Sequence, residues 1–164
     1  MVYRALCTRA APDRRTSSGQ AEEPVSPTDR NPAQRTIRVV AAIIEQGGRY
    51  LITQRRPNAV LPLLWEFPGG KVEAGETDAR ALARELTERL GVKVDVGELV
   101  SAEPHAYEHY TVDLNVYACR IVHGEPECIA VHSFRWVTSA EFDAYPFTPA
   151  DEISMNKLLG VFDA

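Results

Sequence analysis

The chain alternates between apolar runs of strand length and one amphipathic stretch of helical length. The first apolar run covers 37–44, and the turn residues Gln46-Gly47-Gly48 separate it from a second run at 49–55. Two such runs around a glycine turn predict a β-hairpin. Shorter or more strictly alternating runs predict further strands, at 65–67, 92–100, 105–110, 112–120 and 134–137.

A helix is predicted between Thr77 and Gly91, after a loop that contains three glycines. Thr77 is suited to cap the N-terminus, and Gly91 stands where a left-handed C-cap would fall. Glu85 and Glu88 lie three residues apart and are expected to project together from the face opposite the apolar one. Two adjacent carboxylates repel each other unless a cation lies between them, and Mg²⁺ takes oxygen ligands in this way. The apolar stripe has helical spacing and consists of Ala79, Leu82, Ala83, Leu86 and Leu90.

The end of the chain predicts two more helices. Thr138 and Glu141 form a capping-box pattern for a short helix, and Pro149 fits the first turn of a final helix that runs to about Leu159. Strands, a helix, more strands and a helix indicate the α/β class, with a mixed sheet and helices on both faces.

Residues 1–35 differ in composition from the rest. They contain several prolines, serines and arginines and few large apolar groups, so they cannot bury enough surface to offset the entropy of ordering. We expect a disordered or loosely attached N-terminal tail, which is either a solvated linker or an arm that docks an acidic partner. The folded domain is expected to span 36–162.

Net charge, cysteine spacing and the length of the apolar runs limit the partners and locations that are expected. The 164 residues carry a net charge of −5, which argues against binding to polymeric nucleic acid. The three cysteines have no paired spacing, so neither a disulfide framework nor a zinc site is expected, and a cytoplasmic location is the default. No apolar run approaches the ~20 residues of a membrane span. A monomer and a homodimer both stay open.

The stretch from Phe67 to Val92 resembles the Nudix box, G-x5-E-x7-R-E-U-x-E-E-x-G-U with U aliphatic. Gly70, Glu76 and the run from Arg84 to Val92 match every fixed position except one, where Arg89 replaces the second glutamate of the E-E pair. Four segments outside or at the entry of the box resemble the MutT-type branch in particular: 52–55, 65–70, 135–137 and 147–151. The resemblance implies an α/β/α sandwich, with the box helix on one face of a mixed sheet and the C-terminal helix on the other.

The resemblance also implies roles for the matching residues. Glu85 would be a metal ligand and the general base, or its organiser. Glu88 would be a second ligand and the carbonyl of Gly69 a third, with Mg²⁺ as the ion and Mn²⁺ as a substitute. Glu76 would contact the ligand residues rather than the ion itself. Arg84 would orient the carboxylates through the bidentate fork of its guanidinium.

Substrate contacts are expected at three further positions, two from the resemblance and one, His105, from the alternation along a predicted strand. Arg55 matches an arginine near the nucleotide, although an exposed arginine at a strand end would look the same. Asp151 stands where the branch reads the base edge, and it could accept from an exocyclic amine or, if protonated, donate. This favours a pyrimidine or an oxidised nucleotide, whereas the alternative is an ordinary acid in the first turn of a helix. His105 would share a strand face with Tyr107 and His109, lining the pocket or forming a polar sheet face.

Two positions depart from the family pattern. Arg89 places a cation where a metal ligand is expected, and Ala130 stands where the branch commonly supplies a carboxylate, for which Glu127 could substitute. Arg89 could swing away or bind phosphate itself, or the site could bind without turnover. The expected activity is that of a MutT-type pyrophosphohydrolase, which splits a nucleoside triphosphate into monophosphate and pyrophosphate and could sanitise the nucleotide pool. The alternatives are hydrolysis of another diphosphate conjugate and a non-catalytic nucleotide-binding module.

Overall fold

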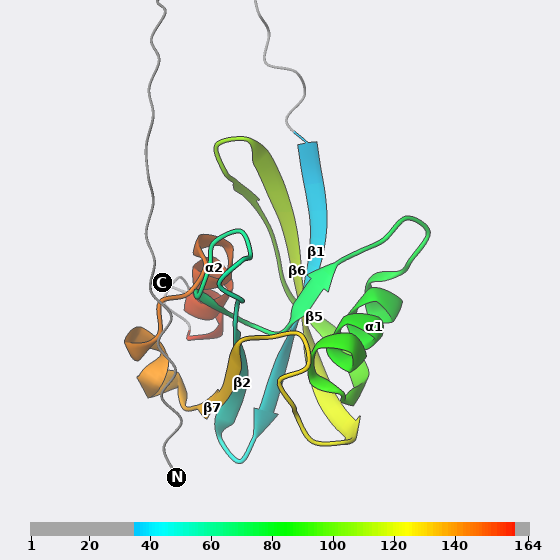
Figure 1. The fold of residues 1–164 in the computed structure, drawn as a ribbon, viewed down its shortest axis with the longest axis vertical. Coiled ribbons are helices and arrows are strands. Elements are labelled where there is room, and N and C mark those ends of the chain that lie inside the picture. The colour runs from blue at the N-terminus through cyan, green and yellow to red at the C-terminus, as the bar shows by residue number, and fades with distance from the viewer. Residues whose placement is uncertain (1–34, 160–164) are drawn as a thin grey trace, which may run out of the picture. The chain divides into compact units, whose positions relative to one another are not determined.

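A computed structural model describes residues 35–159 of the chain. The predicted tail therefore lies outside the described residues, apart from its last position. Neither of the α-helices in the described range is long and apolar enough to cross a membrane. The helices are α1 (Asp78–Leu90), the 3₁₀ helix η1 (Ser139–Ala144) and α2 (Pro149–Leu158); the strands are β1 (Arg35–Gln46), β2 (Arg49–Gln54), β3 (Trp65–Glu66), β4 (Gly69–Lys71), β5 (Lys93–Ala106), β6 (Tyr110–His123) and β7 (Ser133–Val137) (Figure 1).

The seven strands form one mixed sheet, as the sequence predicts. Its main path runs β3-β2-β1-β6-β5, with β4 paired to β1 and β7 paired to β2. The β1–β6 pair is parallel and the other pairs are antiparallel. The long β1 strand is therefore central, and it carries the elements that flank it on both sides.

Alternating residues of β1 separate two apolar clusters, one on each face of the sheet. Val40, Ala42 and Ile44 pack in one cluster with residues of α1, such as Leu82, whereas Ala41 and Ile43 pack in the other with residues of α2. Because successive side chains of a strand point to opposite faces, this near-continuous apolar run requires cover on both sides. Figure 1 shows α1 and α2 on opposite sides of the sheet, which confirms the predicted sandwich.

The box helix begins and ends as predicted, but its buried face is different. The Thr77 hydroxyl accepts from the backbone N–H three residues on, and Gly91 has φ of 70°. The predicted stripe was wrong at Ala79, which is exposed; Ala81 is buried instead. The side chain of Glu85 is also buried, so it does not project from the solvent face as we expected from spacing alone.

Two strand predictions need correction. The 92–100 and 105–110 runs are not two separate strands, because β5 runs from the first into the start of the second and ends at Ala106, and the turn of the β5–β6 hairpin occupies 107–109. The interruption near Gly97 is instead a place where the pairing with β6 shifts register, as a β-bulge does without ending a strand. Strand β4 was not predicted, because it lies within the stretch that was expected to be a glycine-rich loop.

Candidate active site

Two glycines of β4 allow the strand to approach both β1 and the box helix. A Cβ on Gly69 would lie 1.9 Å from the carbonyl oxygen of Val40, and one on Gly70 would lie 2.2 Å from Cδ of Glu85. Neither glycine has a positive φ; in this loop only Gly75 does. Their lack of a side chain therefore serves close packing rather than a tight turn, and it places the Glu85 carboxylate directly against the β4 backbone.

Arg84 connects the acidic side chains of the box. Its Nε and Nη2 donate to the two oxygens of Glu76 at 2.7 and 2.9 Å, and Nη1 donates to Glu85 at 3.0 Å and Glu88 at 3.3 Å. A further bond from Nη2 to the carbonyl of Lys71 ties the group to β4. The hydrogen bonds from Arg84, helped by one from a backbone N–H, lower the pKa of Glu76 to about 2. Arg84 thus holds the loop carboxylate and the helix carboxylates in one network.

Arg89 binds the same buried carboxylate from the other side. Its Nε donates to Oε2 of Glu85 at 2.6 Å, while Arg84 binds Oε1. The carbonyl oxygen of Arg89 accepts from the backbone N–H groups of Ile129 and Ala130, so the segment after β6 packs on the end of the helix. Arg89 therefore does not swing away from the box; it forms an ion pair within it.

A cavity of about 650 Å³ opens beside this ion pair. Gly69, Gly70, Glu85 and Arg89 line one part of it, and residues of β2, β3 and α2 line another. Its size falls within the usual range for a small-molecule site. The charged and polar groups that enter it from outside the box helix are Arg55, Glu66, Lys71, Glu73, Thr148 and Asp151.

Arg55 and Glu66 form a second ion pair in this cavity. Arg55 Nη1 lies 3.0 Å from Glu66 Oε2, and Arg55 Nε donates to the carbonyl of Val60 at 2.7 Å. Burial raises the pKa of Glu66, and the positive charge of Arg55 opposes this shift. Sequence reasoning named Arg55 but missed Glu66. The available signal was a charged residue between the two apolar aromatics of a short strand, Trp65 and Phe67.

Asp151 is held at the first turn of α2 and, as a residue, is only 6% exposed. Oδ1 accepts from the backbone N–H of Phe67 at 3.2 Å, and Oδ2 accepts from the Thr148 hydroxyl at 2.5 Å. Burial, followed by the negative charge of Glu66, raises the pKa of Asp151 to about 7. The carboxyl group is therefore poised between a form that donates and a form that only accepts.

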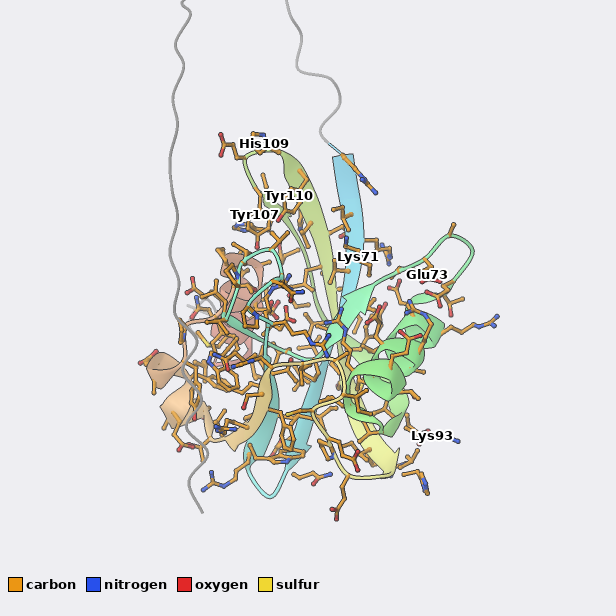
Figure 2. The ribbon with its side chains drawn as sticks, viewed as in Figure 1. Lys71, Glu73, Lys93, Tyr107, His109 and Tyr110 are labelled. Atoms are coloured by element: carbon orange, nitrogen blue, oxygen red, sulfur yellow. The ribbon has the colours of Figure 1, made fainter. Side chains whose placement is uncertain are left out.

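Aromatic side chains of the β5–β6 hairpin line the rim of the cavity. The rings of Tyr107 and Tyr110 are stacked, with centroids 5.0 Å apart and planes at 24°. The His105 ring contacts Tyr107 at 4.7 Å but does not line the cavity. His109 does not share their strand face, because it lies in the hairpin turn and is 82% exposed (Figure 2). Tyr110, which was not singled out from the sequence, takes the place in the lining that we expected for a histidine.

The model of one protein family, the NUDIX domain, matches residues 39–157 of this chain. The chain belongs to the NUDIX family. A CTP pyrophosphohydrolase of Escherichia coli is 38% identical over 115 residues, which cover 70% of this chain and 85% of the relative. An 8-oxo-dGTP diphosphatase of Haemophilus influenzae is 34% identical over 127 residues, covering 77% and 93%. The crystal structure of a MutT NUDIX hydrolase from Burkholderia pseudomallei has a TM-score of 0.69 and 26% identity, covering 76% and 98%.

These similarities make the chain a MutT-type Nudix hydrolase, an enzyme that acts on phosphoanhydride bonds. The expected carboxylate ligands, however, are paired with arginine, and Nη1 of Arg84 lies between the carboxylates of Glu85 and Glu88. Glu88 is exposed and lies along an outer groove with Thr87, whereas Gly69 and Glu85 line the cavity. Both oxygens of Glu85 accept from guanidinium groups. The arrangement therefore does not fit an ion held by the Gly69 carbonyl, Glu85 and Glu88 together.

The second family position at which a ligand was expected does not supply one either. The side chain of Ala130 has no atom that could bind a metal ion, and the exposed Glu127 is not part of the cavity lining. Between residues 35 and 159 no three His, Cys, Asp or Glu side chains form a group that could hold a metal ion. In this Nudix hydrolase, the Arg89–Glu85 ion pair stands where a further acidic ligand was expected.

Proposed function

We propose that this protein hydrolyses nucleoside triphosphates to monophosphates and pyrophosphate. One observation carries the proposal: a single cavity joins Glu85 of the box helix to Arg55 and Asp151. A triphosphate lying along it would have its phosphates near the box helix and its base near α2. Relatives whose names specify CTP or 8-oxo-dGTP as substrates support a nucleotide as the ligand.

Positioning and charge would account for most of the catalysis, because phosphoryl transfer needs little covalent help from the protein. Arg84 fixes the Glu85 carboxylate against β4. An oxygen of Glu85 that accepts one hydrogen bond keeps a second lone pair for a water molecule. That water attacks the α-phosphorus and gives a proton to the Glu85 carboxylate. The bond between the α-phosphorus and the oxygen that bridges to the β-phosphorus breaks, and pyrophosphate leaves.

The divalent ion, Mg²⁺ or Mn²⁺, would enter with the nucleotide. Mg²⁺ commonly uses substrate phosphates together with only one or two protein carboxylates. The phosphates would therefore supply the ligands that this site lacks, and the protein would recognise the complex of metal and nucleotide as its substrate. This agrees with a cavity in which the box carboxylate is already paired with arginine.

Asp151 would contact the base edge. The ionised carboxylate accepts from an exocyclic amine, such as N4 of cytosine, and the protonated group can donate to a carbonyl oxygen instead. A pKa of about 7 makes both forms available near neutral pH. The proposal thus covers pyrimidine nucleotides and oxidised purine nucleotides, and Tyr107 or Tyr110 offers a ring for stacking.

The Arg89–Glu85 ion pair favours a second candidate, a module that binds nucleotides without turnover. A panel assay separates the two. Purified protein is incubated with canonical and oxidised nucleoside triphosphates, nucleotide sugars and ADP-ribose, with Mg²⁺ or Mn²⁺, while pyrophosphate and phosphate release are followed. The proposal requires pyrophosphate from a triphosphate at a rate well above that of Glu85→Gln. Equal rates for the two proteins would leave only binding.

Recognition of the nucleotide base by Asp151 is tested with a separate variant. Asp151→Asn should change the ratio of kcat/KM between CTP and 8-oxo-dGTP while leaving the dependence on Mg²⁺ concentration unaltered. An unchanged ratio would show that Asp151 does not read the base, even if the enzyme turns over.

A further inference from the structure

We infer that Arg89 is the cation that binds the phosphate chain in this site, in place of a divalent ion that the protein would hold itself. The inference rests on the proposed function only in taking a phosphate chain as the ligand. It concerns binding, so it can be tested whether or not the bond is hydrolysed.

Arg89 is positioned by three contacts. Its Nε is bound to Glu85 one helical turn earlier, and two backbone N–H groups of the 129–130 segment bind its carbonyl oxygen. Its side chain is about one-third exposed and lines the cavity. Within residues 35–159, Nη1 and Nη2 of Arg89 donate no hydrogen bond. The guanidinium is thus anchored by one nitrogen and can present the others to the cavity, in the fork geometry that suits a phosphate.

At Oε2 of Glu85, the guanidinium of Arg89 already occupies the place that a free cation would take. A metal ion that used Oε2 of Glu85 would have to displace the Arg89 guanidinium, which is 2.6 Å away, or sit beside its positive charge. Because like charges at such distances repel strongly in a partly buried site, the protein alone should bind divalent ions weakly. A triphosphate meets the opposite condition, since it brings negative charge to an arginine already directed at the cavity.

Arg89 also acts beyond its own ion pair. Its positive charge is among the influences that lower the pKa of Glu66, and the charge of Glu85 raises it. All four residues of the two ion pairs, Arg89–Glu85 and Arg55–Glu66, line the same cavity. A phosphate chain lying between them would contact one arginine from each side.

The first test measures the metal affinity of the nucleotide-free protein by titration with Mn²⁺, followed by electron paramagnetic resonance. Arg89→Glu should bind Mn²⁺ at least tenfold more tightly than the wild type. Arg135→Glu makes the same charge change at an exposed position of β7, outside the cavity, and should match the wild type. A wild type that binds Mn²⁺ as tightly as Arg89→Glu would overturn the inference.

The second test measures phosphate binding without metal. A CTP analogue with methylene groups in place of its bridging oxygens is titrated calorimetrically in EDTA. Arg89→Gln should weaken binding at least tenfold, Arg89→Lys should retain part of the affinity, and Arg135→Gln should leave it unchanged. If Arg89 only positions Glu85, Arg89→Gln will bind the metal-free analogue as the wild type does, and the inference fails. Circular dichroism of each variant confirms that the fold is kept; should Arg89→Gln not fold, Arg89→Lys and Arg135→Gln give the comparison.

Discussion

Replacing Asp151 by asparagine should remove a large pH dependence of stability. Burial and the charge of Glu66 raise the pKa of Asp151 from 3.8 to about 7. Between these values the unfolded chain releases the proton and the folded protein keeps it, so the free energy of unfolding falls as the pH rises. The full difference is about 4 kcal/mol, at 1.36 kcal/mol for each pH unit between the two pKa values.

Asparagine resembles the neutral acid in shape and can keep both contacts. Its oxygen can accept from the backbone N–H of Phe67, and its amide can donate to the hydroxyl of Thr148. The variant has no proton to lose, so its stability should stay higher as the pH increases. Glu66 titrates in both proteins, and the difference between them includes the repulsion between the Glu66 and Asp151 carboxylates, which the variant lacks.

The measurement is urea unfolding of wild type and Asp151→Asn at pH values from 4 to 8. The stability of the variant relative to wild type should increase across this range by an amount approaching 4 kcal/mol. Asp143→Asn makes the same chemical change on an exposed side chain and reports what the substitution does without burial. Parallel curves for wild type and Asp151→Asn would refute the claim that a buried, protonated carboxyl group contributes to the fold.

Four further variants test the box and the cap of its helix. Gly70→Ala should reduce kcat more than tenfold in the panel assay with little loss of structure, because a Cβ at this position would displace the Glu85 carboxylate. Gly69→Ala should instead lower the melting temperature, because its Cβ would clash with the β1 backbone. Arg84→Lys should also lower kcat at least tenfold with an unchanged circular dichroism spectrum, since a single ammonium group cannot replace the fork; an active lysine variant would refute this role. Thr77→Ala should cost about 1 kcal/mol of stability in urea unfolding through loss of the helix cap, and no change would show that the cap is dispensable.

The two-sided sheet could be predicted because the β1 sequence leaves no alternative. Its residues from Val39 to Ile44 are all apolar, and such a strand needs cover on both faces. The ends of α1 were equally clear, since Thr77 and Gly91 are typical capping residues. β4 could not be found in the same way, because Gly69 and Gly70 read as a flexible loop unless the backbone that each approaches is known.

The site shows the same division between local and long-range information. Spacing alone placed Glu85 and Glu88 together, because it describes an isolated helix. In the folded protein, packing against β4 buries Glu85 and leaves Glu88 exposed. The partners of Asp151 and Arg55 come from segments far away in the chain, so their burial and the importance of Glu66 depend on tertiary structure.

Arg89 unites these observations, because its meaning depends on which carboxylate it meets. On a solvent-exposed helix, an arginine four residues after a glutamate would form an ordinary surface ion pair of small energetic weight. Here Glu85 is buried beside Gly70, so the same spacing places a cation at the wall of a cavity that also contains the Arg55–Glu66 pair. A charge reversal in the box thus need not abolish the site. Direct binding of phosphate by Arg89 replaces a metal ion held by the protein, and the metal that reaches the site would come with the substrate.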